Sequence, residues 1–285
     1  MKELFKLFIR EKRFLDNISP LTIKSYEVSF QKFEQYATEL SKPSLNDFVI
    51  GMREEGLKPG GINVKIRSIN SFLSWCFENN HTDGHLKIKQ LKTAETTIKT
   101  FSDAHIKALL RFKPKSKYQW RFYAITCLLI DSGARIEEGL GLKVTGVDFD
   151  QLFITIRGKG DKERIVPISP ELRKILYTFE TKHRIKGYSD YFFSTRDGAK
   201  VIYRNYIKEL LGVAEELGIT GVRISPHGFR HYFSLNYLKQ GGDIYTLSRI
   251  LGHTTVSTTE VYLRSMGIEQ IRESVKFSPL SKLRL

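Results

Sequence analysis

Cysteine is scarce in this sequence of 285 residues, which contains only Cys76 and Cys127. The two lie far apart, each inside an apolar periodic stretch, and neither has neighbours at metal-ligand spacing. This scarcity excludes a small scaffold held by disulfides and a structural zinc site of the usual kind. Both cysteines are therefore predicted to be core residues, and a reducing compartment such as the cytoplasm fits them best.

Long apolar runs are missing as well. No stretch approaches the roughly 20 residues that a membrane-spanning helix needs. The opening Met1-Lys2-Glu3 does not resemble a signal peptide. The sequence therefore predicts no membrane partner. Hydrophobic residues make up 41% of the chain and charged residues 27%, which is typical of a folded globular protein and argues against disorder.

Acidic side chains are outnumbered, because 31 Asp and Glu stand against 46 Lys and Arg, which gives a formal net charge of +15 at pH 7. Clustered Lys and Arg bind a polyphosphate backbone favourably because binding releases its condensed counterions, so nucleic acid is the favoured partner. A solvated basic surface, or attraction to an anionic membrane, would produce the same excess. The charge alone leaves these alternatives open.

The first third of the sequence predicts a small helical bundle. One helix begins at Ser19-Pro20, where a capping residue is followed by proline in the first helical position. A shorter helix is predicted to follow Ser44 and to end at Gly56, and another to start near Pro59. Along the first of these helices, apolar residues recur at steps of three and four: Ile23, Tyr26, Phe30, Phe33, Ala37 and Leu40.

The helical periodicity fails between about residues 79 and 100, where the sequence becomes polar and then basic. We therefore predict a helical domain over residues 1–90, a linker over residues 91–100 and a second domain over residues 101–285. If the partner is nucleic acid, the basic linker would lie close to phosphates.

The second domain is also predicted to be mostly helical. Its exception is a β-hairpin, in which Leu152–Arg157 and Glu163–Ile168 flank a glycine-rich turn that carries Lys159. Later helices are predicted around Tyr203–Leu217 and from Phe229 to Lys239. The predicted fold class is therefore mainly α with a small β-hairpin.

Three candidate residues of this domain lie at breaks or turns, and each has an ordinary explanation. Arg135 could be an ordinary arginine at the start of a helix, paired with Glu138. Lys159 is at a hairpin tip, where lysine often serves only solubility. His253 follows Gly252, the usual glycine stop of a helix.

Three further candidates lie in helical stretches and are equally undistinguished when taken singly. His227 and Arg230 form a His-x-x-Arg step whose side chains share one helical face, and such steps occur by chance. Tyr262 is one of thirteen tyrosines. The order and spacing of all six residues carry more information than any one of them.

The candidates fall in four longer segments, SGARI (132–136), GKGDKER (158–164), SPHGFRH (225–231) and LGHTTVSTTEVY (251–262). In this order and spacing the segments resemble the tyrosine recombinase (phage integrase) family, in its compact Xer and Cre type. The resemblance covers nearly the whole chain, and the last two segments are the most specific. It implies a helical core-binding domain followed by a catalytic domain. It also implies a site-specific DNA recombinase that works through a 3′-phosphotyrosine intermediate and a Holliday junction.

The chemistry of such a reaction agrees with these residue types. Tyr262 would supply the nucleophile. Arg135 and Arg230 would offer planar, permanently charged forks to the phosphate oxygens, which gain negative charge in the transition state. His227 and His253 can add hydrogen bonds or move the proton of the nucleophile near neutral pH.

The departing 5′-oxygen is the atom that most needs a proton, because a sugar alkoxide is a poor leaving group. In the family the lysine that matches Lys159 is the general acid. Lys162 and Arg164 remain alternatives for that role, or contacts to phosphate. The sequence contains no phosphate-binding glycine loop and no carboxylate cluster, so no metal and no other cofactor is predicted.

The resemblance further implies double-stranded DNA with an inverted-repeat core site as the partner, bound by two protomers, with four protomers in a synaptic tetramer. We expect the two domains to clamp duplex DNA in the cytoplasm, at the nucleoid. The segment after Tyr262 is expected to dock on a neighbouring subunit, with packing on its own domain left open as the alternative. Integration, excision and the resolution of dimers or cointegrates all remain open. Two alternatives stay open as well, a type IB topoisomerase and a helical DNA-binding regulator without catalysis.

Overall fold

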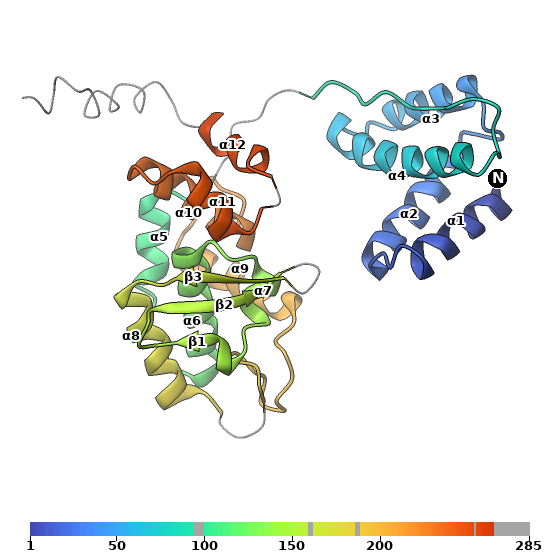
Figure 1. Cartoon of the computed structure of the whole chain (residues 1–285). Coiled ribbons are helices and arrows are strands. Elements are labelled where there is room, and N and C mark those ends of the chain that lie inside the picture. Colours follow the sequence, from blue (N-terminus) through green and yellow to red (C-terminus); the bar gives the residue numbers. More distant parts are fainter. Residues whose placement is uncertain (94–99, 159–161, 186–188, 254, 265–285) are drawn as a thin grey trace, which may run out of the picture. The chain divides into compact units, whose positions relative to one another are not determined.

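The computed structural model describes residues 1–93, 100–158, 162–185, 189–253 and 255–264 (Figure 1). This part of the chain is mainly helical with one three-stranded sheet, which confirms the predicted fold class. The chain divides into two compact units, Met1–Thr96 and Thr97–Leu285, and each is described by itself. In the described ranges no helix is both long and apolar enough to cross a membrane.

Over its described residues, 1–93, the first unit has four helices, α1 (Lys2–Phe14), α2 (Pro20–Phe33), α3 (Lys42–Glu54) and α4 (Pro59–Glu78). The Ser19 hydroxyl accepts a hydrogen bond from the Thr22 backbone at the predicted start of α2. Helix α3 begins earlier than predicted, because the hydroxyl of Ser41, rather than that of Ser44, caps it. Aromatic rings fill the core, and those of Phe5 and Phe30 stack at 3.8 Å between centroids.

The chain beyond α4 runs back along this helix and is tied to it by two buried or half-buried amides. The Asn63 side chain donates to the carbonyl of Leu91 and accepts from its N–H, both at 2.8 Å. Asn70 makes the same pair of bonds with Ile88, at 2.9 and 2.8 Å. Much of the stretch in which periodicity fails is therefore an extended segment of the first unit, since side-chain amides replace a strand as its hydrogen-bond partner.

The second unit is built around helix α6 (Lys117–Ser132), on which the α-helices α7, α8, α9 and α10 and the π-helix η2 (Phe179–His183) pack. Its sheet has the strand order β1-β2-β3, and the predicted hairpin is confirmed in β2 and β3. Ile154, Ile156 and Val166 of the hairpin are fully or almost fully buried. The other α-helices and the strands are α5 (Asp103–Leu110), α7 (Ile136–Leu140), β1 (Val147–Asp148), β2 (Phe153–Arg157), β3 (Glu163–Pro167), α8 (Pro170–Thr178), α9 (Tyr203–Glu216), α10 (Pro226–Lys239), α11 (Ile244–Leu251) and α12 (Ser257–Arg264).

Two details of this unit differ from the prediction or extend it. Helix α10 begins at Pro226, three residues before the predicted start, since proline suits the first helical position. His227 therefore lies in the first turn of the same helix as Arg230. Strand β1 was not predicted, because its two residues carry too little alternation to be recognised in a sequence. Cys76 and Cys127 are buried, as predicted.

Candidate active site

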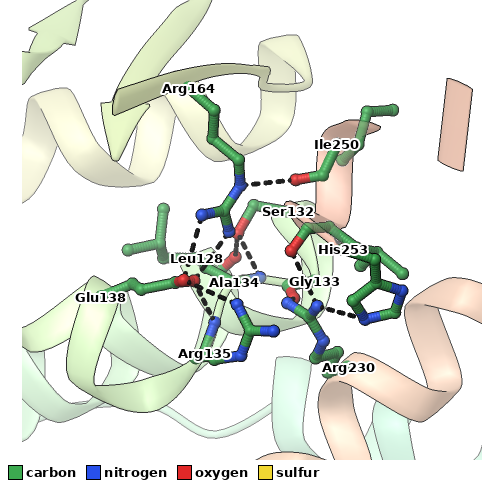
Figure 2. Close-up of polar contacts among 11 residues, drawn as sticks. Leu128, Ser132, Gly133, Ala134, Arg135, Glu138, Arg164, Arg230, Ile250 and His253 are labelled. Atoms are coloured by element: carbon green, nitrogen blue, oxygen red, sulfur yellow. Dashed lines mark hydrogen bonds and ion pairs between the residues drawn. The ribbon is translucent and has the colours of Figure 1, made fainter. Parts of the chain in front are cut away.

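Four segments that are distant in the sequence meet at the ends of helices α6, α7, α10 and α11 (Figure 2). Helices α6 and α11 both end at a glycine in the left-handed conformation, Gly133 with φ 62° and Gly252 with φ 65°. These stops leave carbonyl groups at both helix ends without a partner inside the helix. Arg135 follows the first stop and His253 the second.

Arg230 is the buried centre of the site, with 1% of its surface exposed. Its Nη1 donates to the Gly133 carbonyl at 2.9 Å, and its Nη2 donates to the Leu251 carbonyl at 2.8 Å. Nη2 also lies 2.8 Å from Nε2 of His253. One guanidinium therefore joins the ends of α6 and α11, where the carbonyl oxygens carry partial negative charge. Burial, together with the charge of Arg135, lowers the pKa of Arg230 to about 10.

Arg135 is the more exposed of the two predicted arginines, since 44% of its side chain is accessible. Its Nη1 donates to Oε1 of Glu138 at 3.0 Å, which is the pairing that an ordinary helix-start arginine would make. Figure 2 shows its guanidinium next to that of Arg230. The structure therefore brings Arg135 and Arg230 close enough for their charges to interact, with Arg135 partly accessible to solvent and Arg230 buried.

Glu138 has a second and stronger partner, Arg164 of strand β3. Nη1 and Nη2 of Arg164 donate to the two carboxylate oxygens at 3.0 and 2.7 Å, and its Nε donates to the Ile250 carbonyl at 2.8 Å. Burial alone would raise the pKa of Glu138, but hydrogen bonds from Arg164 and from the backbone of Arg135 lower it. The carboxylate thus stays ionised, and all three guanidinium nitrogens of Arg164 donate hydrogen bonds to Glu138 or Ile250.

The Arg164–Glu138 pair links the hairpin to α7, and its removal has a measurable consequence. Arg164→Met is expected to lower the free energy of unfolding by about 3 kcal/mol, because it leaves a buried carboxylate short of its bidentate partner. Adding Glu138→Gln removes the buried charge that has lost this partner, so the double variant is expected to be more stable than Arg164→Met alone. Urea unfolding of both proteins measures the difference.

The exposed ion pair Arg157–Glu163 in the same hairpin provides a matched control. Arg157→Met is expected to change the free energy of unfolding by less than about 1 kcal/mol, because an exposed pair contributes little. If Glu138→Gln lowers the stability of Arg164→Met further, the pair does not hold the hairpin in the way described.

His253 has both ring nitrogens engaged. Because a guanidinium only donates, Nε2 of His253 accepts from Arg230, and Nδ1 must carry the proton that it donates to Oγ1 of Thr259 at 2.8 Å. Thr259 is fully buried and lies on α12. Burial and the charges of Arg230, Arg135 and Arg164 lower the pKa of His253 to about 4, so the ring is neutral at pH 7.

Tyr262 lies on α12 and is buried, with 4% of its surface exposed. Its hydroxyl is 3.2 Å from Nδ1 of His231, on α10. The His231 ring also packs against His227, with 4.3 Å between centroids and an edge-to-face arrangement. His227, which was predicted as a site residue, therefore contacts His231, which was not predicted, and His231 in turn contacts Tyr262. Burial lowers the pKa of His227, as do the charges of Arg230 and Arg135.

His231 was present in the segment SPHGFRH but received no role in the sequence analysis. A signal was available, because His231 is four residues after His227 and so shares its helical face. Glu138 was noted only as the partner of Arg135, and Arg164 only as an alternative to Lys159 or as a phosphate contact. A pairing between residues 26 positions apart leaves no periodic signal in a sequence.

A groove of about 910 Å³ opens beside these residues, between the base of the hairpin and the end of α11. Arg135, Gly158, Lys162, Arg164 and His253 are among the residues that line it. Lys159, the predicted general acid, lies outside the described residues, as does the segment after Arg264 that is expected to dock on a neighbour. Across the ranges that the structure describes, no group of three His, Cys, Asp or Glu side chains could hold a metal ion.

Comparison with known proteins adds independent information. Residues 99–267 match the phage integrase family. The tyrosine recombinase XerD of Listeria innocua is 30% identical over 262 residues, which cover 86% of this chain and 88% of that protein. The tyrosine recombinase XerA of Pyrococcus furiosus is 28% identical over 270 residues, covering 92% of this chain and 89% of that protein.

Solved structures share the fold. The Tn1549 transposon integrase in complex with transposon right end DNA has a TM-score of 0.77 at 18% identity, covering 96% of this chain and 98% of that one. A lambda integrase dimer bound to a core site has a TM-score of 0.76 at 11% identity, covering 94% and 96% of the two chains. At such identities the likeness shows the common architecture.

Proposed function

The chain belongs to the phage integrase family of tyrosine recombinases, and on that premise we propose how its residues cut and rejoin DNA. The protein is a tyrosine site-specific recombinase, and DNA is its partner. The observation that carries the proposed mechanism is the arrangement around Arg230. This buried guanidinium has the exposed guanidinium of Arg135 beside it and His253 hydrogen-bonded to it.

In cleavage, the phenolic oxygen of Tyr262 attacks the scissile phosphorus, forms a P–O bond and breaks the bond to the 5′-oxygen. Extra negative charge develops on the non-bridging oxygens, and fixed cationic donors stabilise it. Arg135, which lines the groove, donates hydrogen bonds to those oxygens. The hydrogen bonds described for Arg230 use three of the five donors of a guanidinium. Its positive charge adds to the field that stabilises the same oxygens.

The 5′-oxygen leaves with a proton, which we assign to Lys159 at the tip of the hairpin. This assignment is supported by the described base of that hairpin, because Gly158 and Lys162 line the groove together with Arg135. Rejoining is the reverse reaction, in which a 5′-hydroxyl attacks the phosphotyrosine. The phosphotyrosine keeps the energy of the broken bond, so rejoining requires no nucleotide hydrolysis.

We propose that two protomers occupy an inverted-repeat site and that four form the synapse in which strands are exchanged through a Holliday junction. Two related proteins support this arrangement. XerH has been described bound to a palindromic difH substrate, and lambda integrase as a dimer on a core site. In this scheme residues 1–90 form the core-binding domain, residues 91–100 the linker and residues 101–285 the catalytic domain.

The test of this function is whether a defined DNA site is required. A plasmid that carries two direct copies of the site, recovered from host DNA bound to the protein, is expected to be split into two circles. A plasmid without the site is expected to keep its supercoils. Gel electrophoresis of both plasmids gives the answer, and relaxation of the plasmid without the site at a comparable rate would favour a topoisomerase instead.

A further inference from the structure

A buried threonine connects the helix that carries Tyr262 with the arginine at the centre of the site. His253 accepts a hydrogen bond from Arg230 at Nε2 and donates one to Oγ1 of Thr259 from Nδ1, both at 2.8 Å (Figure 2 shows the first). Thr259 is three residues before Tyr262 on α12, so the two side chains share one face of that helix. We propose that Thr259 is a positioning residue that holds α12, and with it Tyr262, in place for attack through its bond to His253. The proposal rests on Tyr262 being the nucleophile.

Helix α12 depends on contacts with the rest of the unit for its position. A helix of eight residues is not stable by itself in water, and α12 packs on α10 and α11. Among its described side chains, Thr259 and Tyr262 are buried, whereas the apolar Val261 and Leu263 are 45% and 43% exposed. The buried face of α12 thus contains a hydroxyl whose hydrogen bond gives the contact a direction as well as a place.

The direction of the two hydrogen bonds makes the contact specific. With its proton on Nδ1, His253 has a lone pair on Nε2 that accepts from Arg230. A proton on Nε2 would instead face a guanidinium N–H, which is also a donor. By accepting from Nδ1, Thr259 favours the tautomer that bonds to Arg230. Thr259 is fully buried, so water is not at hand to accept in its place.

The consequence for the reaction is a fixed path from the arginine to the nucleophile. Two hydrogen bonds of 2.8 Å and about one helical turn separate the guanidinium of Arg230 from Tyr262. Cleavage requires the phenolic oxygen in line with the phosphate, and a displacement of about 1 Å can slow such a step about 100-fold. Loss of the Thr259 hydroxyl is therefore expected to slow the chemical step and to leave binding of DNA intact.

Thr259→Val tests this role, because valine keeps the shape of threonine and lacks the hydroxyl. It is expected to slow single-turnover cleavage of a nicked duplex about 10-fold, with the affinity for the DNA site within about twofold of the parent. Thr259→Ser keeps the acceptor and is expected to cleave within about threefold of the parent rate. Thr246→Val is the matched control, since it makes the same change at an exposed position of α11 and is expected to leave the rate unchanged.

Two further measurements separate positioning through His253 from a general loss of packing. If Thr259 acts through His253, Thr259→Val is expected to add less than about twofold to the slowing caused by His253→Ala. In protein labelled with ¹⁵N-histidine, NMR of the parent is expected to show the proton of His253 on Nδ1. Thr259→Val is expected to gain the form with the proton on Nε2, whereas Thr259→Ser is expected to keep the parent spectrum.

Cleavage by Thr259→Val within about twofold of the parent rate would overturn the proposal. Equal slowing by the valine and serine variants would overturn it too, as would effects that multiply in the double variant with His253→Ala. The NMR measurement needs no DNA and therefore separates two kinds of failure. A parent protein that forms no adduct with DNA would contradict the proposed function. One that forms the adduct but lacks the Nδ1–H form of His253 would contradict the role of Thr259 alone.

Discussion

Replacement of Tyr262 by phenylalanine is expected to abolish covalent attachment to DNA while binding of DNA persists. The substitution removes only the phenolic oxygen. In the proposed mechanism this oxygen is the nucleophile, so no covalent bond to DNA can form without it. The ring keeps its buried place in the cluster with Leu238, Leu247 and Leu251. The lost hydrogen bond to His231 is expected to lower the free energy of unfolding by only about 1 kcal/mol.

The measurement is the protein–DNA adduct that resists detergent on a nicked duplex, compared with a mobility shift on the intact site. Tyr245→Phe is a matched control, because this tyrosine lies on α11 and is 70% exposed. It is expected to form the adduct at the parent rate. An adduct that survives in Tyr262→Phe would identify a different nucleophile and defeat the mechanism.

Arg230→Lys is the second substitution with a large expected effect, and it acts on both catalysis and stability. A lysine presents one ammonium group and cannot bond the Gly133 and Leu251 carbonyls and His253 in the same geometry. We expect cleavage to slow by about 100- to 1000-fold. The free energy of unfolding is expected to fall by about 2 kcal/mol, because one ammonium group cannot donate to the carbonyls of both helix ends in this geometry.

The matched variant is Arg135→Lys, which separates the two effects. Cleavage is expected to slow by a similar factor of about 100 or more, since the fork on the phosphate is lost. The stability is expected to change by less than about 1 kcal/mol, because 44% of the Arg135 side chain is exposed. Single-turnover cleavage and urea unfolding measure the two quantities. Equal destabilisation by both substitutions would contradict the division into a buried and an exposed arginine.

Local patterns in the sequence predicted much of the secondary structure. The start of α2 at Ser19-Pro20 and the antiparallel hairpin follow from interactions between near neighbours, and the structure confirms both. The start of α3 was wrong by three residues, because Ser41 and Ser44 both suit a cap and the choice depends on packing. The extended segment held by Asn63 and Asn70 was not recognised, since its partners lie 28 and 18 residues away.

For the site, the sequence by itself determined which residue types are available and, through the spacing of four segments, the family and its chemistry. The tertiary structure decided what each side chain touches. It paired Arg164 with Glu138, joined Arg230 to carbonyl groups at two helix ends, and hydrogen-bonded His231 to Tyr262. The physical reason is that caps and periodicity depend on residues within one or two turns. These contacts instead depend on how β3, α10, α11 and α12 pack against one another.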